Sequence, residues 1–285
     1  MTARIALLHP REMGAAIGAY AKAMGHAVGW AAHGRSEATR NRAIEAELKT
    51  YSTLGELLEN VDMVITVCPP AAANRTASEV AKTGFDGIYL DANAISPRSA
   101  QAVADTVEAG GTTYVDGDII GAPPYADGTT RLYLCGARAA DAAAYFAGSK
   151  LKAVDIGGHR TAASALKMCY AAWTKGSSAL LLAVRALARA EGIQDALCEE
   201  WNPSQPSLES NSESAASINA AKAWRFVGEM QEIVSTFDDS RLSGDDHRAA
   251  AQTYASLTAY KNASPPPTLE DVLQTMLAAR YGAAH

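Results

Sequence analysis

Two short stretches near the start of the chain carry residues suited to binding phosphate groups. The first lies between a short apolar run and an Ala-rich helical pattern and reads His9-Pro10-Arg11-Glu12-Met13-Gly14. A turn between a strand and a helix offers backbone N–H groups to a pyrophosphate, usually with glycines spaced G-x-G-x-x-G. Here only Gly14 keeps its expected place, because His9 and Arg11 stand at the first two glycine positions. The spacing indicates a dinucleotide-binding turn that departs from the usual pattern, and all of its residues except Pro10 are candidate cofactor ligands.

The second stretch follows the predicted strand Ala27–Ala31. In dinucleotide-binding folds an acidic residue there binds the adenosine ribose hydroxyls, whereas a basic residue accepts a 2′-phosphate. This chain has no acid there and carries Arg35, Ser36 and, one helical turn later, Arg40. These side chains would clamp a phosphate by charge-assisted hydrogen bonds, which favours NADP(H) over NAD(H) as cofactor. The alternative is that Ser36 only caps a helix and both arginines are solvated.

The elements that would position these residues follow from the hydrophobic pattern up to about residue 157. Short apolar runs alternate there with amphipathic helical patterns, and the predicted strands are Ile5–Leu8, Ala27–Ala31, Met63–Cys68, Gly87–Asp91, Thr113–Asp116 and Leu132–Cys135. This alternation predicts an α/β fold with a Rossmann-type, doubly wound and mostly parallel sheet. Thr53 and Glu56 have the spacing of a capping box, and Pro97 suits the first turn of another helix.

The rest of the chain has a helical pattern. One run of about 31 residues, Thr161–Glu191, is rich in Ala, Ser and Leu and would extend roughly 46 Å. Further helical patterns cover about 213–239, 245–261 and 268–281, after a predicted polar loop at Glu199–Ser212. We therefore predict a dinucleotide-binding domain at 1–157 and an all-α domain for substrate binding and dimerisation at 158–285. The long helix is suited to a buried core and equally to the spine of a homodimer.

Composition excludes several classes of function. The formal net charge is -6, and no cluster of Lys and Arg is present to neutralise nucleic-acid phosphates. No signal-like or membrane-length apolar segment is found, so we expect a cytoplasmic protein with no membrane contact. The cysteines have no spacing suited to zinc, and we expect no metal and reduced, buried thiols at Cys68, Cys135, Cys169 and Cys198.

Taken in order, five stretches resemble the β-hydroxyacid dehydrogenase superfamily, which includes 3-hydroxyisobutyrate and 6-phosphogluconate dehydrogenases and the imine reductases. They are the turn ending Glu12-Met13-Gly14, the strand end Val64–Pro70, the segment Asp91–Pro97, the segment Asp116–Pro123, and the helix carrying Lys167. The resemblance covers nearly the whole chain, and it depends on the order and spacing of the stretches. It implies an NAD(P)-dependent oxidoreductase acting on a small molecule, with nicotinamide in the cleft between the domains.

The resemblance implies a catalytic role for Lys167, which would hydrogen-bond the reacting oxygen. A lone lysine on an apolar helix is costly to bury unless it is paired or deprotonated, and the alternative is a lysine that snorkels at the helix surface. Tyr170 and Thr174 lie three and seven residues further on, on the same helical face. Tyr170 is a second catalytic candidate, or else a core residue, and Thr174 is a candidate for substrate binding. Trp173 lies off that face and is expected in the core or an interface.

The resemblance also assigns residues around the cofactor and substrate. Asn93 would lie near the nicotinamide ribose, or else cap a turn, and Cys68 and Pro69 at the preceding strand end are further cofactor candidates. Glu229 on a later helix is a candidate for substrate binding. Together with Glu232 and His247 in the C-terminal helices, it would face the cleft of the same or the partner subunit, or else be solvated. The expected substrate loop consists of Ile120, Gly121, Ala122 and Pro123.

Some positions depart from the hydroxyacid dehydrogenase pattern. The usual Asn after the lysine is Ala171, the Ser-Gly-Gly loop begins at Ile120, and a later Lys-Asp pair reads Gly228-Glu229. Because a hydrogen bond to a charged group contributes about 1.5–3 kcal/mol, a simple 3-hydroxy acid is disfavoured as substrate. The stretch Asp116–Pro123 is closer to the imine reductases, so C=O and C=N reduction both stay open. The alternative function is a catalytically silent dinucleotide-binding or regulatory protein, because Arg11 crowds the pyrophosphate space.

Overall fold

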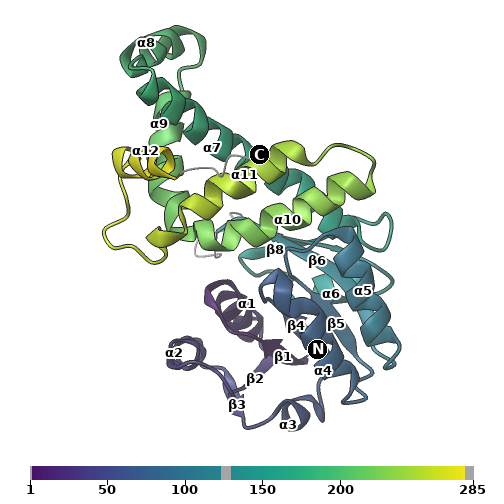
Figure 1. Cartoon of the computed structure of the whole chain (residues 1–285). Helices are drawn as coiled ribbons and strands as arrows, with labels where there is room; N and C mark the ends of the chain where they lie inside the picture. Colours follow the sequence, from purple (N-terminus) through teal and green to yellow (C-terminus); the bar gives the residue numbers. More distant parts are fainter. Residues whose placement is uncertain (1, 123–129, 280–285) are drawn as a thin grey trace. The chain divides into compact units, whose positions relative to one another are not determined.

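The computed structural model describes residues 2–122 and 130–279, and the chain divides into two compact units between Met168 and Cys169. Figure 1 shows the strands in the first unit and helices in the second. The predicted fold class, a Rossmann-type α/β sheet followed by an all-helical part, is confirmed. Within the described residues, no helix is both long enough and apolar enough to cross a membrane.

The sheet of the first unit has eight strands in the order β3-β2-β1-β4-β5-β6-β7-β8. The strands are β1 (Arg4–Leu8), β2 (Ala27–Ala31), β3 (Lys49–Tyr51), β4 (Met63–Thr66), β5 (Ile88–Asp91), β6 (Thr113–Ile120), β7 (Thr130–Cys135) and β8 (Leu151–Asp155). Neighbouring strands are parallel except β6 and β7. The strand order reverses between β1 and β4, and doubly wound sheets bind ligands outside the carboxyl ends of the strands at such a switch point.

Helices cover both faces of this sheet. One face packs against α1 (Glu12–Ala23), α2 (Glu37–Glu45) and α6 (Ala139–Ala144), and the other against α3 (Leu54–Leu58), α4 (Ala73–Ala81) and α5 (Pro97–Glu108). On β4, Ile65 belongs to the first apolar core and Val64 to the second. Alternate residues of one strand are therefore buried on opposite faces, which explains the continuous apolar runs in the sequence.

The strand predictions need three corrections. Strands β3 and β8 were not predicted, and β6 continues beyond its predicted end at Asp116 to Ile120. Residues 116–120 pair with β7 in antiparallel register, so a polar segment that resembles a loop is held as a strand by its neighbour. The predicted capping box at Thr53 and Glu56 is present, and Pro97 lies in the first turn of α5 after the cap Ser96.

The helical part contains the long helix α7 (Ala162–Ala190), which begins before Met168 and continues into the second unit. It is followed by α8 (Gln194–Ser204), α9 (Leu208–Ser214), the π-helical η2 (Ala215–Asn219), η3 (Ala220–Lys222), α10 (Ala223–Asp239), α11 (Asp245–Ser256), η4 (Thr258–Tyr260) and α12 (Leu269–Ala278). The predicted polar loop at Glu199–Ser212 is wrong, because α8 and α9 occupy most of it. Pro203 lies inside α8, one residue before its end, where it removes one backbone hydrogen bond of the last turn, and the hydroxyl of Ser212 donates to the carbonyl of Glu209.

The four cysteines are free thiols, but they differ in exposure. Cys68 and Cys135 are buried, as predicted. Cys169 is exposed and Cys198 is half-buried, so the expectation of four buried thiols is wrong for these two. Among the residues placed by the structure, no group of three or more His, Cys, Asp or Glu side chains has an arrangement suited to a metal ion.

Candidate active site

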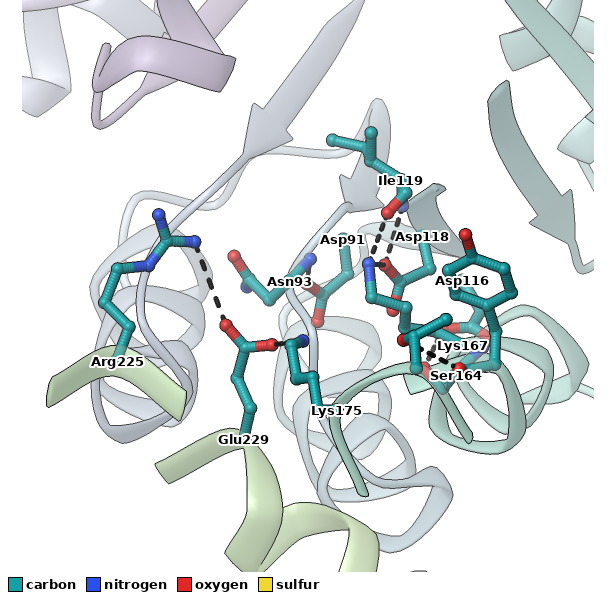
Figure 2. Close-up of polar contacts among 12 residues, drawn as sticks. Asp91, Asn93, Asp116, Asp118, Ile119, Ser164, Lys167, Lys175, Arg225 and Glu229 are labelled. Carbon is teal, nitrogen blue, oxygen red and sulfur yellow. Dashed lines mark hydrogen bonds and ion pairs between the residues drawn. The ribbon is translucent and has the colours of Figure 1, made fainter. Parts of the chain in front are cut away.

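Two aspartates of β6 contact the first turns of α7 (Figure 2). The Asp116 carboxylate accepts hydrogen bonds from the backbone N–H of Ser164 at 2.8 Å and from its hydroxyl at 2.6 Å. Two residues further on, Asp118 Oδ1 lies 3.1 Å from Lys167 Nζ, which also donates to the carbonyl of Ile119. The side chain of Lys167 is 14% exposed and that of Asp118 is 2% exposed. Lys167 is therefore a largely buried, paired cation, and it does not snorkel at the helix surface.

Burial dominates the protonation of the aspartates at this edge of the sheet. It raises the pKa of Asp118 to about 7, although the Lys167 ammonium acts in the opposite direction. Burial, followed by the charge of Asp116, raises the pKa of Asp91 at the end of β5 to about 8. Burial also raises the pKa of Asp116, against the hydrogen bonds from Ser164. This end of the sheet therefore changes its charge close to neutral pH.

Asn93 connects the ends of two neighbouring strands. Its Oδ1 accepts a hydrogen bond from the backbone N–H of Cys68 at 2.5 Å, and its Nδ2 donates to Thr66 Oγ1 at 3.3 Å. The backbone N–H of Asn93 donates to Asp91 Oδ1 at 3.1 Å. Asn93 is 1% exposed, so its side chain fixes the segments that follow β4 and β5. Its contact with a cofactor stays a prediction, as do those of Cys68 and Pro69.

The turn after β1 combines strain with positive charge. His9 has a φ of 69°, in the left-handed region, and a Cβ added at Gly14 would lie 2.7 Å from the His9 carbonyl oxygen. The tight turn therefore requires glycine at position 14 but accommodates a side chain at position 9. Burial, together with the charges of Arg35, Arg11 and Arg75, lowers the pKa of His9 to about 4. Three guanidinium groups thus lie close enough to influence this turn.

Arg35, Ser36 and Arg40 differ in how the protein uses them. Ser36 caps α2 by accepting a hydrogen bond from the backbone N–H of Thr39 at 3.4 Å, the alternative role considered above. Arg40 donates to the backbone carbonyls of Ala32 and Arg35, at 3.0 and 3.3 Å.

Arg35 has an unsatisfied donor close to this turn. Its Nε is buried and finds no hydrogen-bond partner within the described part of the chain, and the same holds for His9 Nδ1. Burial lowers the pKa of Arg35. Because an unpaired buried donor costs free energy, an anion that accepts from it would stabilise this region. The turn and Arg35 therefore fit the phosphate groups of a dinucleotide.

The predicted substrate loop continues from β6. Ile120 is buried, whereas Gly121 and Ala122 are exposed. Gly121 has a φ of 124°, which only glycine adopts readily, and the carbonyl of Ala122 accepts a hydrogen bond from the Thr130 hydroxyl. Pro123 lies outside the described residues. Residues 120–122 offer a ligand no side-chain hydroxyl or charge.

In the second unit, two aromatic residues of α7 lie at the surface. Tyr170 is 46% exposed and Trp173 is 75% exposed, so neither is a core residue of the single chain. The Thr174 hydroxyl donates to the carbonyl of Tyr170 at 3.0 Å, within the same helix. Catalysis by Tyr170 and substrate binding by Thr174 stay predictions.

Glu229 belongs to a buried charge network that was not predicted from the sequence (Figure 2). Its carboxylate forms an ion pair with Lys175, and Arg225 Nη2 lies 3.8 Å from its Oε1. The side chains of Glu229 and Lys175 are 9% and 16% exposed, so the expectation of a solvated Glu229 is wrong. The spacing of Arg225 and Glu229, four residues apart on one helix, was the available signal. Asp118 was likewise absent from the predicted site residues, because nothing in the sequence relates it to Lys167.

Three features of this sheet are typical of one class of protein, the dinucleotide-dependent dehydrogenases. They are the switch point, the turn containing Gly14, and the buried Lys167 of α7 beside the end of β6. Comparisons with known proteins agree with this class. Residues 5–146 match the NAD binding domain of 6-phosphogluconate dehydrogenase, and residues 188–257 match a domain of unknown function, DUF1932. An uncharacterized 28.5 kDa protein of Methanothermus fervidus is 30% identical over 176 residues, which are 58% of this chain and 63% of that protein.

Solved structures extend the similarity over nearly the whole chain. Mycobacterium tuberculosis 3-hydroxyisobutyrate dehydrogenase superimposes with a TM-score of 0.72 at 19% identity, over 98% of this chain and 100% of that one. An imine reductase from Pseudomonas sp. gives a TM-score of 0.54 at 13% identity, over 98% and 99%. Residues 5–146 therefore form an NAD binding domain of the 6-phosphogluconate dehydrogenase type, and the solved dehydrogenase and reductase structures share the fold of nearly the whole chain.

Proposed function

We propose that this protein is an NADPH-dependent oxidoreductase acting on a carbonyl, alcohol or imine carbon of a small to medium substrate. The observation that carries the proposal is Lys167, a largely buried ammonium held at the end of β6 by Asp118 and the carbonyl of Ile119. This position lies on the same sheet edge as the turn after β1, because β1, β4, β5 and β6 are parallel. When bound, the nicotinamide supplies or accepts the hydride, and the chain orients the partners and moves the proton.

Lys167 has the donors that this role requires. An ammonium has three N–H donors, and two of them are used by Asp118 and Ile119. We assign the third to the oxygen or nitrogen of the reacting group. On reduction this N–H gives its proton to that atom, and on oxidation the neutral amine takes the proton back. A positioned general acid of this kind contributes roughly 10²- to 10⁴-fold in rate.

The preference for NADPH depends on Arg35. The buried Nε of Arg35 lacks a protein partner within the described residues. Arg35 also follows the second strand, where a 2′-phosphate is bound in this fold. Arg40 is engaged with backbone carbonyls, and we assign it a bracing role behind Arg35. The pyrophosphate is assigned to the turn from His9 to Gly14, with Arg11 directed outward to pair with a phosphate.

Binding and turnover test this proposal separately. Fluorescence titration of the purified protein with NADPH and with NADH is expected to show tighter binding of NADPH. Turnover is then followed at the absorbance of the reduced nicotinamide with a panel of ketones, aldehydes and cyclic imines. NADPH binding without turnover on any member would favour the silent regulatory alternative, and binding of neither dinucleotide would contradict both functions.

We further propose that α7 joins two copies of the chain as a homodimer. Trp173, Leu180 and Leu187 are spaced by seven residues, so they form one line along the helix. Their exposed fractions in the single chain are 75%, 66% and 61%. Three large apolar side chains along one helix face are the pattern of a helix–helix contact, and a second copy supplies the same stripe in a symmetric interface.

The oligomeric state tests this second proposal. Light scattering after size-exclusion chromatography is expected to give twice the chain mass for the wild type and the single-chain mass for Leu180→Glu. Leu242→Glu is the matched control, because Leu242 is 59% exposed but lies outside α7. A monomeric wild type at micromolar concentration would contradict the proposed dimer.

A further inference from the structure

Asp118 occupies the variable third position of the Asp-Gly-x-Ile stretch, and its contact with Lys167 was not expected from the sequence. We propose that Asp118 is a positioning residue: it holds the Lys167 ammonium and cancels its charge, so that the site accepts uncharged or cationic substrates and rejects carboxylates. This inference rests on the proposed function, because it concerns the lysine assigned to proton transfer.

The positioning argument is geometric. Lysine has a long, flexible side chain, and its ammonium is a compact charge that does not fix its own direction. Here Asp118 Oδ1, at 3.1 Å, and the carbonyl of the next residue, Ile119, accept two of its donors. The backbone N–H of Ile119 in turn donates to Asp118 Oδ1 at 2.6 Å, which fixes the carboxylate. Two acceptors on consecutive residues of one strand thus restrict the ammonium to one place.

The specificity argument depends on charge. The ionisable groups facing Asp118 are Lys167 from α7, Asp116 from its own strand and Asp91 from β5; on β7 its register partner is Tyr133. Asp118 thus pairs with one ammonium and has two further carboxyl groups close to it. A substrate carboxylate placed beside Lys167 would meet a cation that Asp118 already neutralises, and residues 120–122 provide no hydroxyl to receive it. A ketone, an imine or a protonated iminium carbon has no such penalty.

The same contact gives the site a pH dependence. Burial raises the pKa of Asp118 to about 7, so the ion pair with Lys167 forms as the pH rises through that value. Turnover is therefore expected to increase with pH up to about 7.5. We call this rise in turnover the acidic limb of the pH profile. The pKa values of Asp116 and Asp91 are also raised, so the limb is assigned to Asp118 only if it disappears when Asp118 is replaced.

The central experiment compares Asp118→Asn with Asp116→Asn. Both replace a buried aspartate of β6 by its neutral isostere, but Asp116 contacts Ser164 and not Lys167. Ethyl levulinate and levulinate serve as substrates, because they present the same ketone without and with a charge. For Asp118→Asn we expect loss of the limb near pH 7, a kcat at least tenfold lower, and a tenfold smaller preference for the ester. Asp116→Asn is expected to keep the preference and to keep a limb, which moves to lower pH because the charge of Asp116 raises the pKa of Asp118.

A second readout does not require activity. Acetylation of Lys167 by acetic anhydride, followed by mass spectrometry, is expected to be at least fivefold faster in Asp118→Asn than in Asp116→Asn. Should Asp118→Asn not fold, Asp118→Ser is measured in its place. Equal acetylation rates would overturn the inference while leaving the proposed function intact. If Lys167 is acetylated faster in Asp118→Asn but the wild-type protein turns over neither substrate nor any imine, the contact is supported and the proposed function is contradicted.

Discussion

The turn after β1 and the end of β6 lie at the same end of one sheet, yet arginines gather at the first and aspartates at the second. At the turn, burial and the charges of Arg35, Arg11 and Arg75 lower the pKa of His9 to about 4. At the end of β6, burial and the nearby charge of Asp116 raise the pKa of Asp118 to about 7, against the effect of the Lys167 ammonium. This end of the sheet is thus divided between two roles: cations lie where phosphates are expected to bind, and acids lie where the proton is expected to move.

The largest effect is expected at the acidic end. Lys167→Met removes the proposed proton donor but keeps the length of the side chain, so turnover should fall by roughly 10²- to 10⁴-fold. The dissociation constant for NADPH should change less than threefold, because phosphate binding is assigned to the other end of the edge. Steady-state kinetics and fluorescence titration measure the two quantities. Equal losses in both would contradict the division of roles.

The next effect concerns the basic end. Arg35→Ala is expected to weaken NADPH binding by about 10- to 100-fold, since a charge-assisted hydrogen bond contributes about 1.5–3 kcal/mol. NADH binding should change by less than threefold, because NADH lacks the 2′-phosphate. Arg40→Ala is the matched control, and we expect it to have a smaller effect than Arg35→Ala. An equal loss for NADPH and NADH would assign Arg35 to the pyrophosphate.

The acidic end also predicts how stability depends on pH. The pKa of Asp91 is raised to about 8 in the folded chain, from an ordinary value of 3.8. Between about pH 4 and pH 8 the folded chain keeps this proton, whereas the unfolded chain loses it. The free energy of unfolding of the wild type therefore decreases as the pH rises through this range. Asn at this position does not ionise, so the melting temperature of Asp91→Asn minus that of the wild type should increase with pH. Thermal melts at pH 5, 7 and 9 measure it, and a constant difference would contradict the raised pKa.

The smallest effect has the opposite pH dependence. His9→Gly removes a side chain from a left-handed backbone position, which should raise the free energy of unfolding by about 1 kcal/mol. The pKa of His9 is lowered from 6.5 to about 4, so its neutral form stabilises the fold above pH 6.5 and this stabilisation is lost as the pH falls through 4. The advantage of His9→Gly should therefore grow as the pH falls from 7 to 5. Denaturant titrations at both pH values test the trend.

The sequence predicted the layered sheet well because central strands are buried on both faces and show as apolar runs. It did not predict β3, whose three residues are exposed or half-buried and depend on pairing with β2. Pro203 and the serines around it suggested a loop, but the proline lies inside α8, where it costs one backbone hydrogen bond of the last turn and the helix ends one residue later.

The candidate site was predicted only in part. Lys167 and the turn at His9 to Gly14 follow from spacing and from the resemblance to a family. Asp118 and the pair of Lys175 with Glu229 depend on contacts between segments far apart in the chain, which no local pattern encodes. Arg35 and Arg40 looked equivalent in the sequence, and only the backbone carbonyls around Arg40 distinguish them.

The paired contacts between β6 and α7 have a consequence for chain length. Asp116 and Asp118 are two residues apart on a strand, about 6.8 Å, and their partners Ser164 and Lys167 are three residues apart on a helix, about 4.5 Å. Adding one residue to the helix start would rotate its side chains by roughly 100° and separate both pairs at once. An insertion between β8 and α7 is therefore expected to keep both pairs only if the loop before Ala162 absorbs it, where glycines 157 and 158 already adopt positive φ.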